Sequence, residues 1–333
     1  METILVIPLI LSFFLTLLFI PLWIKKAKQV DLIWEDMNKS GKPKNVAGSG
    51  GLITILSFIF GVLTYISIKT FVLNTDSTTM EIFALLSSIL IALLIGFVDD
   101  ILGWVYGGIS RRFRIALLFF SAIPLMVINA GNSEMLGINF GIIYPLIIIP
   151  LGIIGAGATF NFLAGYNGLE TSQGIIILSA LAIITYLTGN SWISLITLIM
   201  IASLIAFYIY NKYPAKVFPG DVLTYPLGVF IAIIAILGNI EKIAIFFFIP
   251  YIIEVILKSR GGLKKQSFAK VNEDGSLELP YDKIYGLEHL AIKILKKIKK
   301  NGKVYEKDVV YLINFFQILV VIAGFLIFRG NIF

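Results

Sequence analysis

The stretch EIFALLSSILIALLIGFVDDILGW, residues 81–104, joins an apolar run to two adjacent aspartates, Asp99 and Asp100. A helix that crosses a bilayer needs about 20 predominantly apolar residues, which this run approaches. Carboxylates at the edge of such a run are costly to desolvate and are candidates for function. The stretch therefore predicts a transmembrane helix that carries an acidic pair at one end.

Apolar runs of the same kind recur along the whole chain. Hydrophobic residues make up 58% of its 333 residues and charged residues 14%, with a mean hydropathy of +0.93. Soluble chains are nearer a quarter charged, so this composition is typical of membrane proteins. We expect an all-α polytopic membrane protein, a single integral membrane domain over residues 1–333, with about ten transmembrane helices. The expected spans are residues 3–24, 50–70, 81–98, 115–130, 140–161, 172–188, 191–210, 222–237, 242–257 and 309–328.

Basic residues in the connecting segments predict the orientation of these helices. Of the 27 lysines and arginines, 24 fall on one side of the expected spans and 3 on the other. Cytoplasmic loops carry the excess of basic residues, so we expect the richer side to face the cytoplasm. The Ile- and Lys-rich composition favours a prokaryotic, in particular an archaeal, chain in the plasma membrane. In a eukaryote the same topology would suit the endoplasmic reticulum membrane.

Cysteine and histidine usage restricts the chemistry. The chain has no cysteine and one histidine, His289. Thiolate sites and multi-histidine metal sites are therefore excluded. Carboxylates, amides, lysines and arginines are left to carry any catalysis or binding.

The acidic pair and nearby basic residues are candidates for catalysis. Asp99 and Asp100 could hold a divalent cation or act as a base or nucleophile, because adjacent carboxylates perturb each other's affinity for protons. A simple interfacial cap is the alternative. Arg114 follows on the same side of the membrane, and Lys39 lies in EDMNKSGKPKNVAGSGG, residues 35–51, before a glycine cluster. Such helix starts bind phosphate readily, although a solvated loop is the alternative here.

A second segment brings amides and an acid to the expected membrane edge. NFLAGYNGLETSQG, residues 161–174, contains Asn161, Asn167 and Glu170 beside glycines such as Gly165. Amide oxygens and exposed backbone suit both a metal site built from oxygen ligands and hydrogen bonds to a nucleobase. We expect these residues to bind metal or substrate.

A third segment adds an aromatic ring and another acid. In YPAKVFPGDVLTYPLG, residues 213–228, Phe218 precedes a Pro-Gly turn and Asp221 opens the next span. An aromatic ring in this position can stack on a nucleobase. Asp221 is either a metal ligand or a helix cap, and the two roles can coexist.

The longest segment between expected spans covers residues 258–308. It predicts a β-hairpin with its turn at Asp274-Gly275, followed by an amphipathic helix near residues 287–300 that lies on the membrane. Lys264 and Lys265 precede the hairpin and could bind phosphate, the alternative being a solvated basic run.

Together these segments place acids, amides and bases on one side of the membrane. Magnesium prefers oxygen ligands and takes one or two carboxylates plus substrate phosphates. The pattern therefore predicts a pocket for a magnesium-bound pyrophosphate, beside helices that would offer a lipid substrate a hydrophobic groove.

The motifs VDDILGW, NFLAGYNGLE, YPAKVFPGD and SLELPYDK resemble those of the polyprenyl-phosphate N-acetylhexosamine-1-phosphate transferase family, in particular its branch that uses UDP-GlcNAc and dolichyl phosphate. The resemblance covers nearly the whole chain. It implies ten transmembrane helices with a cytoplasmic active site. The implied reaction transfers GlcNAc-1-phosphate from UDP-GlcNAc to polyprenyl phosphate and releases UMP, the first step in assembly of a lipid-linked glycan of the N-glycan type.

The resemblance also implies roles for individual residues. Asn161 and Asp221 match the ligands of Mg²⁺, with Mn²⁺ as an alternative ion. Gly165 and Asn167 match uridine contacts, and Phe218 matches the ring that stacks on uracil.

Asp99 and Asp100 match the acid pair near the lipid phosphate, with Arg114 and Lys39 as basic partners. Where the eukaryotic enzyme has an Arg-His-Arg cluster, this chain has Lys264, Lys265 and Gln266. The bacterial cell-wall precursor transferase has a histidine-rich motif that this chain lacks, which argues against a role in peptidoglycan synthesis.

The implied partners are UDP-GlcNAc, polyprenyl or dolichyl phosphate and the bilayer, with no nucleic acid, and a homodimer stays open. A transferase for another UDP-N-acetylhexosamine, or a membrane transporter, are the rival functions. Mechanistically, either the lipid phosphate attacks directly, or an aspartate first takes up the phosphosugar.

Overall fold

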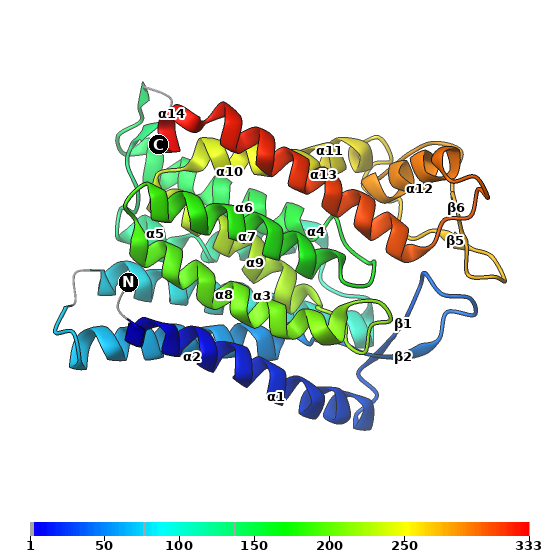
Figure 1. Ribbon diagram of the computed structural model, residues 1–333, viewed down its shortest axis with the longest axis horizontal. Coiled ribbons are helices and arrows are strands. Elements are labelled where there is room, and N and C mark those ends of the chain that lie inside the picture. Colours follow the sequence, from blue (N-terminus) through cyan, green and yellow to red (C-terminus); the bar gives the residue numbers. More distant parts are fainter. Residues whose placement is uncertain (1–2, 76–77, 136–137, 333) are drawn as a thin grey trace.

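The computed structural model describes residues 3–75, 78–135 and 138–332. Its long helices run side by side along one axis, and both termini lie at the same end of the bundle (Figure 1). The opposite end carries two short β-hairpins and a helix outside the bundle (Figure 1). The expectation of an all-α polytopic membrane protein is confirmed.

Within the described residues, seven helices are long and apolar enough to cross a membrane. The first is lengthened at its start by the turn η1 (Thr3–Val6). These helices are α1 (Ile7–Gln29), α2 (Gly51–Phe71), α3 (Thr79–Tyr106), α7 (Leu169–Leu187), α8 (Ser191–Asn211), α9 (Asp221–Gly238) and α13 (Glu306–Ile327).

Two of the three remaining apolar runs are each broken into two shorter helices, whereas in the third the π-helical turn η2 (Tyr144–Ile148) continues into α6 (Ile149–Phe160) without a break. A proline stands in the first turn of the second element each time, at Pro124, Pro150 and Pro250. Proline lacks the N–H that would continue the preceding helix but suits the start of a new one. The count of about ten spans therefore stays a prediction. The pairs are α4 (Arg111–Phe120) with α5 (Ile123–Val127), η2 (Tyr144–Ile148) with α6 (Ile149–Phe160), and α10 (Glu241–Phe247) with α11 (Ile249–Ser259).

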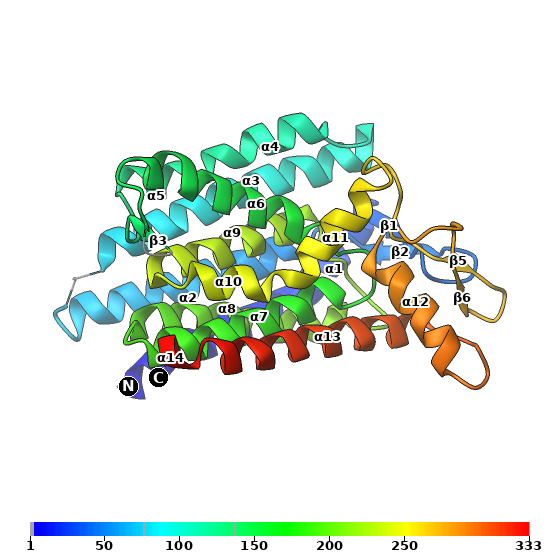
Figure 2. The same ribbon diagram turned by 90° about the horizontal axis from the view of Figure 1, so that it is seen from above.

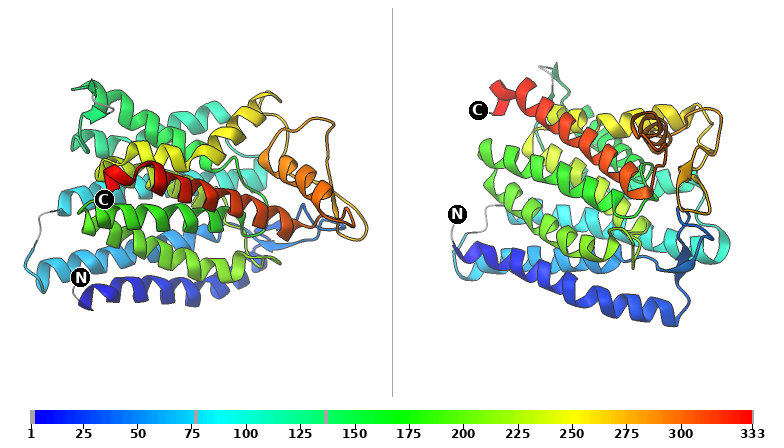
Figure 3. Two further views of the ribbon diagram at one scale, coloured as in Figure 1. Left: turned by 45° about the horizontal axis from the view of Figure 1, so that its top comes forward. Right: turned by 45° about the vertical axis from the view of Figure 1, so that its right-hand side comes forward.

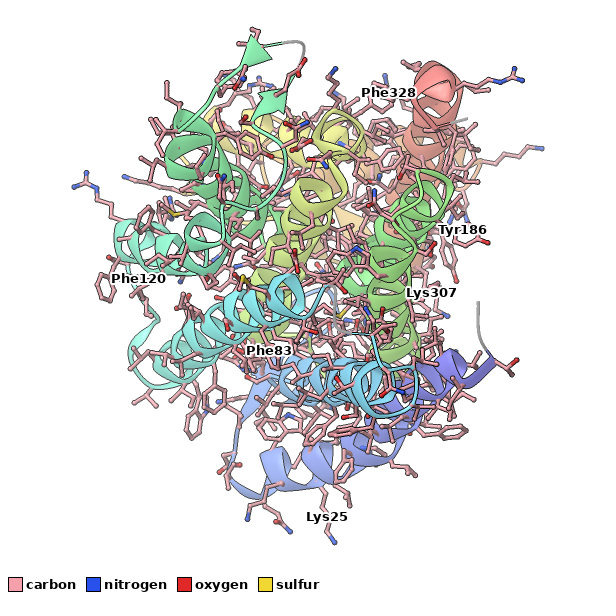
Figure 4. The ribbon with its side chains drawn as sticks, turned by 90° about the vertical axis from the view of Figure 1, so that its left-hand side faces the viewer. Lys25, Phe83, Phe120, Tyr186, Lys307 and Phe328 are labelled. Atoms are coloured by element: carbon pink, nitrogen blue, oxygen red, sulfur yellow. The ribbon has the colours of Figure 1, made fainter. Side chains whose placement is uncertain are left out.

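Helix α9 lies at the centre of the bundle. It packs against α3 on one side and α6 on another, and also contacts α2, α7 and α10. Its sequence is apolar on every face, as expected for a helix surrounded by others. Seen from the end, α9 lies in the middle, while side chains such as Phe120 and Tyr186 lie on the periphery (Figure 4). Both of these side chains are exposed, as lipid-facing groups would be.

Glycines allow α6 and α9 to cross closely. A Cβ atom on Gly228 of α9 would overlap the carbonyl oxygen of Ala156 and lie 2.8 Å from the Cα atom of Gly157. Small residues at such crossings let membrane helices pack backbone to backbone. The crossing fixes the height of α6 relative to α9, and the loop that follows α6 reaches the functional end of the bundle.

The end of the bundle away from the termini carries two small sheets (Figure 2). In the first, β1 (Ile33–Glu35) pairs with β2 (Lys44–Ala47). In the second, β5 (Lys270–Val271) pairs with β6 (Leu277–Glu278), followed by α12 (Leu287–Ile298). The expected hairpin and amphipathic helix before the last span are thus present, whereas β1–β2 arises where only a loop was expected. At the end that holds the termini, β3 (Glu134–Met135) pairs with β4 (Ile138–Asn139) and the chain finishes in α14 (Arg329–Ile332).

Replacing Gly228 by valine should force α6 away from α9 and lower the thermal unfolding temperature in detergent. Overpacking of this kind costs about 1–3 kcal/mol. The matched control is Gly155→Ala, because a Cβ atom at Gly155 meets no atom within 4 Å. The control should keep or slightly raise the unfolding temperature. Equal unfolding temperatures for Gly228→Val and the unmodified protein would contradict the close crossing.

Candidate active site

A cavity of about 750 Å³ opens at the end of the bundle that carries β1–β2 and β5–β6. Its size falls within the usual range for ligand pockets, about 300–1,000 Å³. Loops far apart in sequence meet there: the blue β1–β2 segment and the orange β5–β6 segment lie at the same end (Figure 3). The residues predicted for the site that line this cavity are Asp99, Asp100, Arg114, Asn161, Gly165, Glu170, Phe218 and Asp221.

Asp100 holds the first turn of α9. Its Oδ1 accepts the backbone N–H of Asp221 at 2.8 Å, and its Oδ2 accepts the hydroxyl of Ser49 at 2.8 Å. The first N–H groups of a helix have no partner within the helix, and a carboxylate there is also favoured by the helix dipole. Gly220 precedes the helix with a φ of +73°, and a Cβ atom there would overlap Asp100 Oδ2. Asp100 therefore caps a helix other than its own.

Asp99 is buried in a separate set of contacts. Its Oδ1 accepts the backbone N–H of Ile109 at 2.9 Å, and its Oδ2 accepts the hydroxyl of Tyr225 at 3.1 Å. Arg114 Nε lies 2.6 Å from Asp99 Oδ2 and also donates to the carbonyl of Ile109 at 3.0 Å. The contacts with Asp99 and Ile109 hold the guanidinium of Arg114 at the cavity wall.

Asp221 itself does not cap α9, because its side chain points to other partners. Asn161 Nδ2 donates to Asp221 Oδ1 at 2.8 Å, and Arg114 Nη1 lies 4.0 Å from Asp221 Oδ2. The Asp221 side chain remains 22% exposed, whereas that of Asp99 is 1% exposed. Asp221 and Asn161 are thus the acid and the amide at this wall with ligating atoms still within reach of a ligand.

The charges at this wall do not balance. Three carboxylates, those of Asp99, Asp100 and Asp221, line the cavity beside the guanidinium of Arg114, which contacts Asp99 and Asp221. Over the described ranges, no three Asp, Glu or His side chains come close enough to enclose a metal ion. Magnesium suits such a site, because it typically takes one or two carboxylates and completes its shell with water and substrate phosphates. The donor set fits a divalent cation that arrives with a phosphorylated substrate.

The loop between α6 and α7 forms a second wall. The buried side chain of Glu170 accepts the backbone N–H of Gly165 at 2.8 Å through Oε1. Gly165 has a φ of +98°, and a Cβ atom there would lie 2.7 Å from the ring of Phe268. Phe218, from the loop before α9, also lines the cavity, and its N–H donates to Ala47 at 2.8 Å. The rings of Phe218 and Phe268 thus border one side of the pocket.

Comparison with known proteins identifies the family. A model described as "Glycosyl transferase family 4" matches residues 82–239. A Saccharolobus solfataricus protein, named provisionally as a UDP-N-acetylglucosamine–dolichyl-phosphate N-acetylglucosaminephosphotransferase, is 38% identical over 297 residues, 86% of this chain and 88% of the relative. The chain belongs to the polyprenyl-phosphate N-acetylhexosamine-1-phosphate transferase family.

More distant relatives agree with this assignment. The UDP-N-acetylglucosamine–dolichyl-phosphate N-acetylglucosaminephosphotransferase of Dictyostelium discoideum is 30% identical over 284 residues, 73% of this chain and 68% of that protein. The phospho-N-acetylmuramoyl-pentapeptide-transferase of Halalkalibacterium halodurans is 29% identical over 273 residues, 77% of this chain and 82% of that protein.

Two residues predicted for this transferase's site lie beside the cavity and not in its lining. Lys39 Nζ contacts Glu306 and lies 3.5 Å from Asp36 Oδ2. The backbone N–H of Asn167 donates to Glu306 Oε1 at 2.7 Å, and the N–H of Ala215 donates to Asn167 Oδ1 at 2.8 Å. Lys39 and Asn167 therefore tie the first loop, the 161–168 loop and the start of α13 together.

Lys264 and Lys265 also lie outside the cavity lining. Lys264 is exposed, and Lys265 Nζ lies 4.7 Å from the centre of the Tyr281 ring. Gln266, the next residue, does line the cavity. His289 is buried against the Tyr281 ring, burial lowers its pKa, and it does not line the cavity.

Several lining residues were not predicted from the sequence. Ser49, Trp34, Trp104 and Phe268 line the cavity, and Tyr225 binds Asp99 just behind it. Trp104 ends the VDDILGW motif and could have been recognised as an interfacial aromatic. Trp34 and Phe268 carry no such signal, because their place depends on how β1–β2 and the segment before β5 fold over the bundle.

Removing Asp100 and removing Asp221 should have opposite effects on stability. Asp100→Ala leaves the first turn of α9 uncapped and should lower the unfolding temperature, since loss of a cap costs about 0.5–2 kcal/mol. Asp221→Ala removes one of the carboxylates that share a guanidinium, so the unfolding temperature should stay equal or rise. Thermal unfolding in detergent with EDTA measures both. A larger loss for Asp221→Ala than for Asp100→Ala would contradict the assigned contacts.

Proposed function

We propose that this chain transfers GlcNAc-1-phosphate from UDP-GlcNAc to a polyprenyl phosphate, dolichyl phosphate in particular, giving polyprenyl-diphosphate-GlcNAc and UMP. The observation that carries the proposal is the cavity in which an acid cluster, an arginine and an aromatic ring meet at one end of a membrane bundle. Two relatives whose names state this reaction align over most of the chain.

Asn161 and Asp221 are the residues that would hold a divalent cation, magnesium by preference. When bound, the cation supplies charge neutralisation for the donor diphosphate and for the leaving UMP. Asp100 contributes indirectly, because its carboxylate holds the first turn of α9 and so sets the position of Asp221. Arg114 binds phosphate oxygens with its Nη atoms, since its Nε is fixed on Asp99.

The donor and the acceptor meet different walls of the cavity. The ring of Phe218 suits stacking on uracil, a contact worth about 1–3 kcal/mol per base. The wall with Trp34 and Trp104 offers apolar surface at the bundle's edge, where Trp104 is 40% exposed, and suits the first isoprene units of the acceptor. Donor and acceptor phosphates then converge on the acid cluster.

Direct attack of the acceptor phosphate on the donor is the mechanism that these contacts favour. The attacking oxygen belongs to a phosphate that is already ionised near neutral pH, so no proton need be removed first. Asp99 has its two oxygens occupied by Ile109, Tyr225 and Arg114, and Asp100 is occupied by the α9 cap and Ser49. Neither carboxylate is free to act as a nucleophile without losing these partners.

The proposed reaction has a direct assay. Purified protein in detergent should form UMP from UDP-GlcNAc when polyprenyl phosphate and Mg²⁺ are both supplied, and EDTA should stop it. Asn161→Ala should lower turnover at least about 100-fold, because several kcal/mol of charge stabilisation depend on the cation. Asn132→Ala, an exposed amide at the far end of the bundle, is the matched control.

Failure to form UMP with any UDP-N-acetylhexosamine would contradict the proposal. A panel of UDP-sugars separates GlcNAc from other N-acetylhexosamines. Proteoliposomes separate a transferase from a transporter, because a transporter would move intact UDP-GlcNAc across the bilayer without releasing UMP.

The catalytic end is proposed to face the cytoplasm, in the plasma membrane of a prokaryotic cell, because most loop lysines and arginines lie there. The chain has no cysteine, so single cysteines can report on sidedness. An impermeant maleimide added to intact cells should label Asn132→Cys, beside β3, and spare Glu273→Cys, in the turn between β5 and β6. The reverse labelling pattern would contradict the orientation.

A further inference from the structure

Lys258 joins α11 to the loop that carries Asn161. It lies in the last turn of α11, and its side chain is only 14% exposed. Its Nζ donates to the backbone carbonyl of Phe162, the residue after Asn161, and lies 5.5 Å from the centre of the Phe162 ring. A cation is also favourable there because α6 ends at Phe160, and the last carbonyls of a helix carry partial negative charge.

Glu254 holds the ammonium group in this position. It is fully buried one helical turn before Lys258, and its Oε1 lies 3.3 Å from Lys258 Nζ. Its Oε2 accepts the backbone N–H of Leu287, the first residue of α12, at 2.6 Å. Glu254 therefore fixes Lys258 and the start of α12 together.

Aromatic stacking fixes α11, which carries Lys258, against the end of α6. The ring of Tyr251 stacks on that of Phe160 at a centroid distance of 5.0 Å, with 19° between the ring planes. The ring of Phe248 also stacks on that of Tyr251, at a centroid distance of 4.9 Å. The last turn of α6 and the first half of α11 are thus packed as one unit, and Lys258 reaches from this unit to the next carbonyls of the chain.

A contribution to stability does not by itself explain why Lys258 and Glu254 are buried as an ion pair. Taking an ammonium and a carboxylate out of water costs as much as their attraction returns, and apolar residues of similar volume usually serve as well. A charge-assisted hydrogen bond does fix a backbone carbonyl in one direction, which an apolar contact cannot do. The direction of this carbonyl matters because the amide of Asn161 must meet Asp221, with Nδ2 and Oδ1 2.8 Å apart at the cavity wall.

We propose that Lys258, held by Glu254, is a positioning residue that orients Asn161 for the divalent cation and donor diphosphate. This inference rests on the proposed function for the identity of the ligand. Lys258 touches neither substrate nor cation; it acts through the backbone at Phe162. Two later residues of the same loop are also held through their backbone: the N–H of Gly165 donates to Glu170, and the N–H of Asn167 donates to Glu306.

The test measures cation binding without turnover. Free Mn²⁺ is followed by its electron paramagnetic resonance signal while the purified protein is titrated in the presence of UDP. Lys258→Met should raise the Mn²⁺ dissociation constant at least about tenfold, which corresponds to about 1.4 kcal/mol. Lys258→Arg, which keeps a cationic donor, should bind within about threefold of the unmodified protein. Glu254→Gln should shift the affinity in the same direction as Lys258→Met, but less.

Steady-state kinetics separate positioning from a general loss of structure. In Lys258→Met the KM for UDP-GlcNAc and the Mg²⁺ requirement should rise, while the KM for polyprenyl phosphate stays unchanged. Lys293→Met, an exposed lysine on α12, is the matched control and should change none of these quantities.

Two results would overturn the inference: unchanged Mn²⁺ affinity in Lys258→Met, or equal increases in both KM values. An unmodified protein that binds no Mn²⁺ with UDP and forms no UMP would instead contradict the proposed function itself. The two failures are therefore distinguishable.

Discussion

The carboxylate of Asp100 holds together the three helices on which the site depends. It lies in α3, accepts N–H groups at the start of α9 and accepts the hydroxyl of Ser49, just before α2. Because Asp100 caps the start of α9, the carboxylate of Asp221 is not needed as a cap, although Asp221 lies in the first turn of that helix. Gly220 permits this approach, since any side chain there would overlap Asp100. One buried carboxylate thus leaves another free for a ligand.

The same arrangement shows how the membrane bundle tolerates several charges at one end. Each charged group of the cluster has a partner from a different helix or loop, and the Asp221 side chain, which contacts Asn161 and Arg114, also stays partly exposed. Accumulated carboxylates around a single arginine store unfavourable energy that a bound cation would relieve. Active sites commonly accept such local destabilisation in exchange for function. The surrounding apolar packing, with α9 buried among its neighbours, supplies the stability that this requires.

The sequence predicts the helices and many of the site residues, but it does not predict the contacts between residues that are far apart along the chain. Apolar runs and adjacent polar motifs predict the helices and eight of the residues that line the cavity, because length, hydropathy and loop position are local properties. They do not predict which partner a side chain selects. Lys39 contacts Glu306, 267 positions later, and Asp100 caps a helix that begins 121 positions later, and only the fold decides such contacts. The breaks between α4 and α5 and between α10 and α11 were not predicted, because a proline in an apolar run can either kink one helix or begin another.

The central claim is that Asn161 and Asp221 receive the cation that accompanies a nucleotide diphosphate. The most direct test is the anomalous scattering of Mn²⁺ in crystals of the protein grown with UDP. The account predicts one strong peak about 2.1 Å from side-chain oxygens of both Asn161 and Asp221, next to the diphosphate. A peak between Asp36 and Glu306, or at any site that leaves Asp221 without a metal bond, would contradict it.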